Sequence, residues 1–396
     1  MFDRRTLLSA ATAVTSAMSV ALGGSKAEAK TSNARPIDIE VRGRVGRLER
    51  LPSLALEARQ DFLTDFRGWV NSDFSRAMQS RADAIAMEKG IDPRAEFPLS
   101  RVPEVFADDP VLLAYVRCWL SNQEMTWGQI RDEFHARSDV YAAEMSAWDK
   151  AGPGTLELNP EMKIPEYTKH EIHIQPGGYV GDEFAGHINY YGVNNFYAGK
   201  NFQDEVQRAL AAAVPTPKDG RVARILDMGC GVGRFPIALK ERFPDAEIWG
   251  IDVGGPMVRF GHMRAADMGV DVNFAQRLAE DTRFPDNHFD IVVSYIMFHG
   301  VTLEAQKKIV AEAQRVTRKG GIFFPIDFAT GKQRGVQTPG RAFSVWWDHR
   351  WNNEVWSLQY RYGDFAATLR DAGFDVDESV PSARRNHGGL LATKPA

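Results

Sequence analysis

The chain has 396 residues, of which 44% are hydrophobic and 25% are charged, a composition that excludes a disordered or collagen-like protein. Lysine and arginine number 48 against 52 aspartates and glutamates, so the net charge is −4 and no basic surplus favours general binding to nucleic acid. The two cysteines, Cys118 and Cys230, exclude a disulfide framework and a zinc site built from several thiolates. The length predicts about two or three domains.

Residues 1–29 have the features of a secretory signal peptide. Paired arginines, Arg4 and Arg5, precede an uncharged apolar stretch that reaches Leu22, and residues 27–29 have the small-x-small spacing of a cleavage site. The paired arginines resemble the twin-arginine export signal of bacteria. We therefore expect export to the periplasm, and the alternative is a cytoplasmic protein with an amphipathic N-terminus. Beyond the leader, no apolar run approaches the ~20 residues that span a bilayer.

Residues 30–185 are predicted to form a mainly helical extension or cap. Apolar side chains recur at helical spacing over residues 54–89 and again over residues 111–148. Prolines and aspartates separate these two stretches, and a Gly-Pro-Gly sequence at residues 152–154 ends the second one. We therefore expect two long helical regions ahead of the next domain.

From residue 221 onwards, short apolar runs alternate with helical stretches, which is typical of a parallel sheet with crossover helices. The last two predicted strands are joined without a helix, so they are expected to pair antiparallel at the edge of the sheet. The sequence thus predicts an α/β domain over residues 186–396, a Rossmann-like doubly wound sheet with an antiparallel edge strand. The predicted strands are 223–228, 248–252, 270–275, 289–295, 321–327, 374–378 and 389–393, and the predicted helices are 235–242, 256–267, 303–316 and 365–372.

The strongest motif is a glycine-rich loop directly after the first predicted strand of this domain. Gly229, Gly231 and Gly233 allow a tight turn and a close approach of the backbone to a ligand. A dinucleotide-binding fingerprint requires a further glycine where this chain has Arg234. Asp227, two residues before the first glycine, makes the loop similar to motif I of the class I S-adenosylmethionine-dependent methyltransferases.

Three later segments resemble the same family and follow in the same order. The second predicted strand ends at Asp252, residues 279–290 resemble the stretch that precedes the fourth strand, and residues 315–321 resemble the turn into the fifth. The resemblance implies S-adenosylmethionine as the cofactor. It also implies that Asp252 accepts both ribose hydroxyls and that Val253 lies against the adenine.

The resemblance implies further contacts to the methyl donor. Asp227 is expected near the methionine amino group, and the adenine amino group is assigned to Glu280 or to the backbone of Ala279, because Leu278 stands where the family usually has Asp. Cys230 is expected to pack rather than to act as a nucleophile. The predicted cofactor-binding residues are Asp227, Gly229, Cys230, Gly231, Gly233, Asp252, Val253, Ala279, Glu280, Ser294 and Tyr197.

His299, just beyond the fourth predicted strand, is the candidate catalytic base. Its segment resembles a family stretch that ends in Leu-His-His and borders the methyl donor, and carboxyl ends of strands face the ligand crevice in doubly wound sheets. The alternative is a structural histidine that caps the next helix. Residues 294–297 lack the Asn/Asp-Pro-Pro-Tyr motif of enzymes that methylate amino groups of DNA bases or glutamine, which disfavours nucleic acid as the acceptor.

Two aromatic-rich segments are expected to enclose the acceptor. In the family, an insertion at the place of residues 328–362 forms a lid, and here it contains Trp346, Trp347 and Trp351 as candidate substrate contacts, with packing against the core as the alternative. The second segment, residues 170–197, contains Tyr190 and Tyr197. Its His170-x-x-His173 spacing suggests a metal, but strand alternation would place the two side chains on opposite faces, so no metal site is expected.

The sequence therefore predicts methyl transfer from S-adenosylmethionine to an O or C atom of a small, largely apolar molecule, a substrate class that rests on analogy. One alternative is a protein that binds the cofactor without transferring methyl groups, because the donor is made in the cytoplasm and the leader predicts export. A nicotinamide-dependent oxidoreductase is disfavoured by Arg234. A methyltransferase acting on protein or lipid at the cell envelope stays open.

Overall fold

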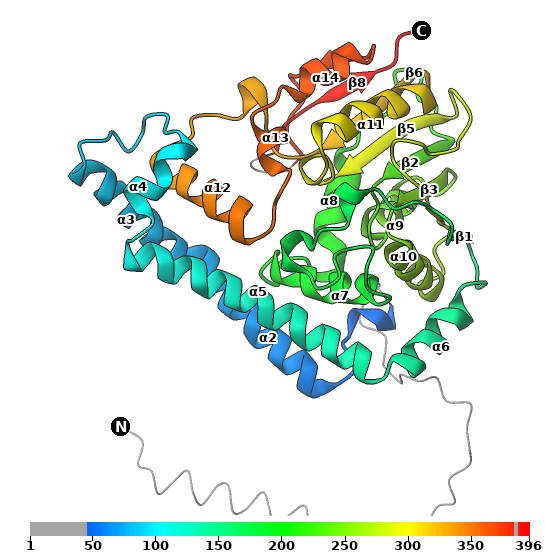
Figure 1. The fold of residues 1–396 in the computed structure, drawn as a ribbon. Helices are drawn as coiled ribbons and strands as arrows, with labels where there is room; N and C mark the ends of the chain where they lie inside the picture. The colour runs from blue at the N-terminus through cyan, green and yellow to red at the C-terminus, as the bar shows by residue number, and fades with distance from the viewer. Residues whose placement is uncertain (1–45, 384–386) are drawn as a thin grey trace, which may run out of the picture. The chain divides into compact units, whose positions relative to one another are not determined.

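The computed structural model describes residues 46–383 and 387–396 (Figure 1). The predicted signal peptide, residues 1–29, and residues 30–45 of the predicted extension lie outside the described residues. The described residues belong to one compact unit. Within this described part of the chain, no helix combines the length and the apolar character that crossing a membrane requires.

The N-terminal region is helical, as the apolar spacing predicts. Ser53 caps the first long helix by accepting a hydrogen bond from the backbone nitrogen of Leu56 at 3.2 Å, and a π-helical turn over Val70–Phe74 joins this helix to the next. Asp109 caps the longest helix ahead of Pro110 at its first position. The helices are α2 (Leu54–Trp69), α3 (Ser75–Glu88), α4 (Val102–Phe106), α5 (Pro110–Ala136) and α6 (Ser138–Trp148).

The described strands form one eight-stranded sheet in the order β1-β4-β3-β2-β5-β6-β8-β7. The strands from β1 to β6 pair in parallel, and β8 runs antiparallel to both β6 and β7, which confirms the doubly wound sheet with an antiparallel edge strand. The strands are β1 (Leu156–Glu157), β2 (Arg224–Met228), β3 (Glu247–Asp252), β4 (Asn273–Gln276), β5 (Phe289–Tyr295), β6 (Thr317–Ile326), β7 (Asp375–Asp377) and β8 (Leu391–Thr393).

The short strand β1 is absent from the sequence prediction. Leu156 pairs with Phe274, so a segment of the predicted helical extension adds a parallel strand to the edge of the sheet. Two residues are too short for an alternating pattern, and the pairing partner lies more than a hundred residues away. The sheet therefore begins within residues 30–185.

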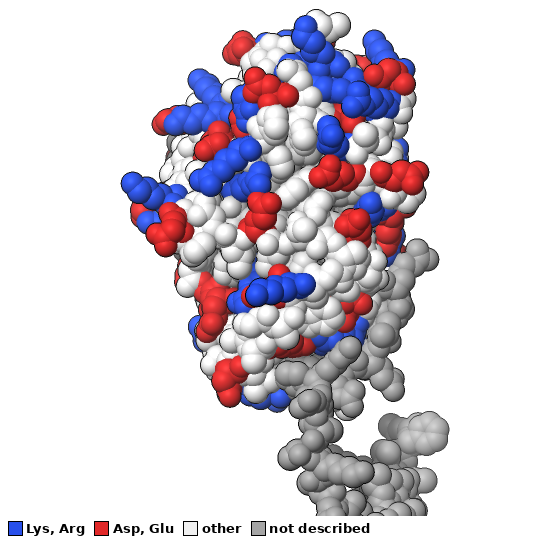
Figure 2. All heavy atoms as spheres, turned by 90° about the vertical axis from the view of Figure 1, so that its right-hand side faces the viewer, with Lys and Arg blue, Asp and Glu red and all other residues white. Residues whose placement is uncertain are grey.

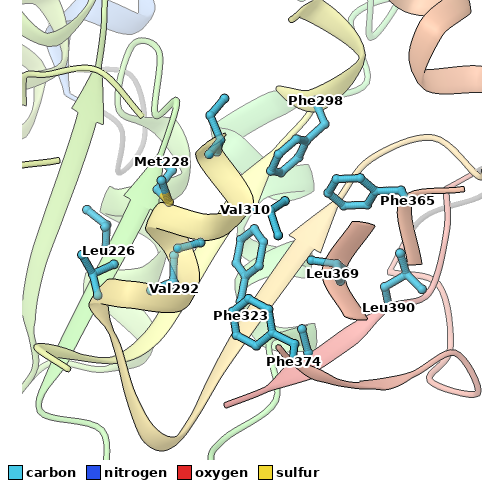
Figure 3. Packing of buried hydrophobic residues seen from close by; sticks show 14 of the residues in the cluster. Leu226, Met228, Val292, Phe298, Val310, Phe323, Phe365, Leu369, Phe374 and Leu390 are labelled. Atoms are coloured by element: carbon cyan, nitrogen blue, oxygen red, sulfur yellow. The ribbon is translucent and has the colours of Figure 1, made fainter. Parts of the chain in front are cut away.

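Helices cover both faces of the sheet. Alternate side chains of each strand point to opposite faces, so Ile225 packs with α8, α9 and α10 while its neighbour Leu226 packs with α11 and α14. Figure 3 shows the second face, where Val310 of α11 and Leu369 of α14 lie near Phe323 of β6. These helices are α8 (Glu205–Ala213), α9 (Arg234–Arg242), α10 (Gly255–Asp267), α11 (Leu303–Val316) and α14 (Phe365–Asp371).

The strand order places a crevice at the carboxyl ends of β2 and β5. From β2 the chain proceeds to β3 and β4 on one side, and β5 and β6 then extend the sheet on the other side. The loops that leave β2 and β5 therefore diverge, and ligands of doubly wound sheets bind at such a switch point. The glycine-rich loop follows β2 and His299 follows β5, so the fold brings them to the same crevice.

Helices α7 and α12 are among the contacts that attach the N-terminal helices to the sheet domain. Helix α7 (Ala185–Gly192) is buried along its whole length between α5 and α10, and a Cβ at Gly192 would lie 1.9 Å from the Trp127 ring. Helix α12 (Pro339–Trp351), which is followed by the short helix α13 (Ser357–Arg361), contributes Phe343 and Trp347 to the core of the N-terminal helices. The predicted lid is therefore built into that helical core.

A buried ionic cluster ties the segment before β2 to α9 and α10. Asp204 is 2% exposed and pairs with both Arg234 and Arg264, and the Arg234 guanidinium lies 4.0 Å from the centre of the Tyr190 ring. Burial alone would raise the pKa of Asp204, but the two arginines lower it. Arg234, the residue that excludes a dinucleotide fingerprint, thus has a structural partner in the fold.

We expect Asp204→Asn to lower the free energy of unfolding by about 3–5 kcal/mol, because two buried arginines would lose their countercharge. Asn tolerates the left-handed backbone of position 204, so the substitution removes the charge without adding strain. Urea denaturation of the two proteins measures the difference. The control is Glu241→Gln in the more exposed pair with Arg208, with a loss below about 1 kcal/mol. Equal losses in both variants would contradict the role of the cluster.

Candidate active site

A cavity of about 470 Å³ opens at the carboxyl ends of the central strands. One part, the glycine-loop half, is lined by residues at the carboxyl ends of β2 and β3 and in the loops that follow β2, β3 and β4, among them Asp227, Gly229, Cys230, Gly231, Asp252, Val253, Ala279 and Glu280. The other part, the histidine half, combines the loop after β5 with α5, the segment before α7 and the predicted lid. It is lined by Trp119, Ile172, His173, Phe196, His299, Phe328, Asp348, Asn352 and Glu354.

Backbone hydrogen bonds attach the glycine loop to strand β3. The nitrogens of Gly229 and Cys230 donate hydrogen bonds to the carbonyl of Ile251 at 2.8 and 2.9 Å. Gly229 has a φ of 75°, and a Cβ there would lie 2.7 Å from the sulfur of Met297. At Gly231 the nearest described atom to a Cβ is the Met257 methyl at 3.8 Å, so this part of the loop leaves its backbone open to the cavity.

Asp252 is fixed at the end of β3 by two backbone donors. Its Oδ2 accepts a hydrogen bond from the nitrogen of Gly231 at 2.9 Å, and its Oδ1 accepts one from Gly254 at 2.8 Å. Burial raises the pKa of this carboxyl. Each carboxylate oxygen retains a second lone pair, so the side chain can also accept hydrogen bonds from a ligand in the cavity.

Asp227 is buried without the partners that a carboxylate needs. It is 1% exposed, and among the described residues its Oδ1 has no hydrogen-bond partner. Burial and the neighbouring Asp252 raise the pKa of this carboxyl well above its usual range. An ammonium group in the cavity would satisfy both the charge and the free oxygen, and Asp227 therefore fits the predicted contact to the methionine amino group.

The predicted adenine end is formed by Ala279 and Glu280, which line the cavity with Val253. The hydroxyl of Tyr167 donates a hydrogen bond to Glu280. This carboxylate therefore already has a partner, and the backbone of Ala279 is the simpler contact for the adenine amino group. Tyr197 also lines the cavity, as the sequence predicts, and its hydroxyl accepts a hydrogen bond from Gln207 at 3.0 Å.

His299 is oriented by a buried carboxylate. Its Nδ1 lies 2.8 Å from Oδ1 of Asp327, which directly follows β6, and Oδ2 of Asp327 accepts a hydrogen bond from the nitrogen of Phe298 at 2.8 Å. The other ring nitrogen, Nε2, lies 4.0 Å from Oε2 of Glu354. Burial alone would lower the pKa of His299, but Asp327 and Glu354 raise it to about 9.

Glu354 and His173 complete this cluster. Oε1 of Glu354 pairs with Nε2 of His173, and Glu354 is 6% exposed. Burial raises the pKa of Glu354 to about 8 and lowers the pKa of His173 to about 3. The structure thus joins His299 to two residues that sequence reasoning did not assign to the site.

The sequence pattern does not assign His173 to the site because its backbone conformation is irregular. The strand alternation that is expected to separate His170 from His173 does not apply, because Ile172–Ile174 form a short 3₁₀ turn in which His173 has a φ of 54°. Its partner in the predicted pair, His170, instead places Nδ1 3.0 Å from the carbonyl of Tyr167. Glu354 follows the tryptophans of the predicted lid, and one acid in an aromatic segment carries no signal of its own.

Several predicted contacts lie outside the lining of the cavity in the described structure. Trp347 is buried against Trp119, with 5.0 Å between ring centres, and Trp351 is 42% exposed beside Trp346, so the packing alternative holds for this helix. The apolar face of α12 is turned to the N-terminal helices rather than to the crevice. Only its end and the loop that follows reach the cavity, through Asp348, Asn352 and Glu354.

The remaining displaced residues are Tyr190, Ser294 and Gly233. Tyr190 is fully buried, its hydroxyl donates to Glu49 at 2.7 Å, and it belongs to the ionic cluster. Ser294 is buried within β5. A Cβ at Gly233 would lie 2.7 Å from the Phe274 ring, so this glycine serves the packing of α9 on the sheet.

The segment that carries the glycine loop is similar in sequence to known proteins. Residues 225–321 match the model of a family described as a methyltransferase domain. The chain is 35% identical over 105 residues to a demethylmenaquinone methyltransferase of Thermus thermophilus, which covers 26% of this chain and 47% of the relative. It is 32% identical over 107 residues to a ubiquinone/menaquinone biosynthesis C-methyltransferase of Burkholderia orbicola. This match covers 27% of this chain and 43% of the relative. The chain thus spans less than half the length of these relatives.

Solved structures are similar over about half of the chain. A TehB-like S-adenosylmethionine-dependent methyltransferase of Corynebacterium glutamicum is 17% identical, with a TM-score of 0.36, over 52% of this chain and 97% of that chain. An O-methyltransferase family protein of Burkholderia thailandensis is 16% identical, with a TM-score of 0.41. The similarity covers 52% of this chain and 61% of that chain. By its sequence match, the segment of residues 225–321, which carries the glycine loop, Asp252 and His299, is similar to a methyltransferase domain.

Proposed function

We propose that the protein transfers a methyl group from S-adenosylmethionine to an O or C atom of a small, largely apolar molecule. The observation that carries this proposal is the continuity of one cavity from the buried Asp227, whose Oδ1 has no hydrogen-bond partner among the described residues, to His299. A donor site and an acceptor site must share one space, because the transfer is a direct displacement that needs both groups aligned. When bound, S-adenosylmethionine supplies a methyl group on a positively charged sulfur.

The glycine-loop half is assigned to the donor. Asp252 would accept the ribose hydroxyls, Asp227 would hold the amino group of the methionine part, and Val253 would lie against the adenine. Both aspartates are held in place before any ligand arrives, since they are buried at strand ends. Gly231 admits the ligand close to the backbone because no side chain stands there.

The histidine half is assigned to the acceptor. Its walls include Trp119, Ile172, Phe196 and Phe328, which favour a largely apolar molecule. In the reaction, the acceptor atom forms a bond to the methyl carbon, the carbon–sulfur bond breaks with its electron pair left on sulfur, and the proton of the acceptor leaves. His299 is the proposed base that accepts this proton at Nε2, since its Nδ1 is held by Asp327 and the residue lines the cavity; because its pKa is raised to about 9, it acts as a base only in its neutral form.

Two further observations support a small molecule, and not a nucleic acid, as the methyl acceptor. One relative is named a demethylmenaquinone methyltransferase and the other a ubiquinone/menaquinone biosynthesis C-methyltransferase, and these names favour a quinone-like acceptor. On the face drawn in Figure 2, acidic side chains lie among the basic ones. That face therefore lacks the continuous basic surface that a nucleic-acid partner would need.

We expect Asp252→Ala to weaken the binding of S-adenosylhomocysteine by about 100-fold, because two hydrogen bonds to a buried carboxylate are lost. Isothermal titration of the purified proteins measures the affinity. The control is Asp245→Ala, an exposed acid in the turn before β3, with unchanged affinity. If the wild type bound NAD but not S-adenosylhomocysteine in the same titration, the assignment of the donor site would be overturned.

We expect His299→Gln to lower the rate of methyl transfer by about 100-fold or more, with an unchanged affinity for S-adenosylhomocysteine, because the residue acts on the acceptor. The measurement is the transfer of isotope from labelled S-adenosylmethionine into the small molecules of a cell extract. His288→Gln, at the opposite end of β5, is the matched control. Absence of labelled product with the wild type would favour the alternative of a binding protein without transfer.

We also propose that the protein is exported by the twin-arginine route, on the basis of residues 1–29. Replacing Arg4 and Arg5 by lysines is expected to retain a tagged protein in the cytoplasm, because the export machinery recognises the arginine pair. Cell fractionation measures the distribution. An equal cytoplasmic location of both proteins would contradict export.

A further inference from the structure

We propose that His173, His299 and Glu354 bind a divalent transition-metal ion, which in turn binds an oxygen of the methyl acceptor. The binding of the ion stands on the cluster itself, whereas its contact with the acceptor rests on the proposed function. Each of the three side chains offers one ligand atom, and these atoms all lie within 4.8 Å of one another. All three line the histidine half of the cavity.

Among the three residues, His299 and Glu354 have the spacing of two ligands of one ion, whereas His173 pairs directly with Oε1 of Glu354 and would exchange that contact for the ion. Two ligands of one zinc ion, each bound at roughly 2.0–2.2 Å, lie about 3–4.2 Å apart. Nε2 of His299 and Oε2 of Glu354 are 4.0 Å apart, which is too long for a hydrogen bond and suitable for two ligands of one ion. Within the described part of the chain, Oε2 of this buried carboxylate has no hydrogen-bond partner.

The backbone near each of the three ligands contains a left-handed residue, which is strained at His173 and Ile296 and tolerated at Asn353. His173, Asn353 beside Glu354, and Ile296 in the loop to His299 have positive φ values of 54°, 60° and 55°. Residues other than glycine rarely adopt this conformation, and such strain concentrates at ligand-binding sites. The surrounding structure holds the ligands in this arrangement before any ion binds.

Hydrogen bonds support these positions. The indole nitrogen of Trp127 donates to the carbonyl of His173 at 2.9 Å. The side-chain nitrogen of Asn353 donates to the carbonyl of Glu171 at 2.8 Å, which ties the loop of Glu354 to the loop of His173. Asp327 pairs with Nδ1 of His299, the arrangement by which a carboxylate orients a metal-binding imidazole and leaves Nε2 free for the ion.

The donor set selects the class of ion. Two imidazoles and one carboxylate suit Zn²⁺ or Fe²⁺, whereas Mg²⁺ and Ca²⁺ prefer oxygen ligands. Three protein ligands would leave coordination positions open for an oxygen of a ligand in the cavity that these side chains line. An acceptor with a phenolic or enolic oxygen would bind there, and the ion would weaken the hold of that oxygen on its proton. In this arrangement Nε2 of His299 would hold the ion instead of acting as the base, and the proton of the acceptor would pass to water in the cavity.

The experiment measures metal binding without donor or acceptor. The full chain is stripped with a chelator and titrated with Zn²⁺ against a chromophoric chelator, and the bound metal is quantified by elemental analysis. We expect one ion per chain for the wild type and at least 100-fold weaker binding for Glu354→Gln and His173→Gln. Co²⁺ should give the visible absorption of a site with imidazole and carboxylate ligands, which both variants lose.

His170→Gln is the matched control, because His170 also lines the cavity but lies outside the cluster. It should bind Zn²⁺ like the wild type, and all variants should retain the wild-type affinity for S-adenosylhomocysteine, which reports an intact fold. Equal Zn²⁺ binding by the wild type and both cluster variants would overturn the proposal, and so would no binding by any of them. The cluster would then be a hydrogen-bonded acid–base group. Because no methyl transfer is measured, this result is independent of the proposed function.

Discussion

Burial of aspartates at the carboxyl ends of three parallel strands is the constraint on which the site depends. Asp252 accepts two backbone hydrogen bonds, and Asp327 accepts one from Phe298 and pairs with His299. Asp227 is buried to the same extent but keeps an oxygen without a partner in the described structure. Burial of an unpaired carboxylate is unfavourable in free energy. A positively charged ligand beside the glycine loop would therefore be stabilised by Asp227.

The N-terminal helical region takes part in the site. Trp119 of α5 and His173 of the segment before α7 line the histidine half, and Glu354 reaches it from the loop after α12. Helix α12 is anchored by Trp347 in the core of the N-terminal helices. The acceptor half of the cavity thus has walls from both regions, which explains why residues 46–383 and 387–396 lie in one compact unit.

Arg234 shows how one residue serves both specificity and stability. Its position requires glycine in a dinucleotide-binding fold, so its side chain argues against a nicotinamide cofactor. In the structure the guanidinium is paired with Asp204 and lies over Tyr190, where it fastens the segment before β2 to α9. Removal of the charge from Asp204 would leave this segment with the more exposed pair of Arg208 and Glu241 as its ionic contact to α9. The same segment carries Tyr197, so the ionic cluster also positions part of the cavity wall.

The sequence by itself determined the sheet, its antiparallel edge, the glycine loop and the placement of Asp252 and His299 at strand ends. These features depend on local spacing, since a loop that follows a parallel strand must emerge at the carboxyl edge. Only the tertiary structure decided that His173 and Glu354 meet His299, that β1 joins the sheet, and that the tryptophans of α12 pack inward. An apolar or aromatic stripe has the same pattern whether it contacts a ligand or a neighbouring helix. The choice depends on partners such as Trp119 and Trp347, which lie far apart in the chain.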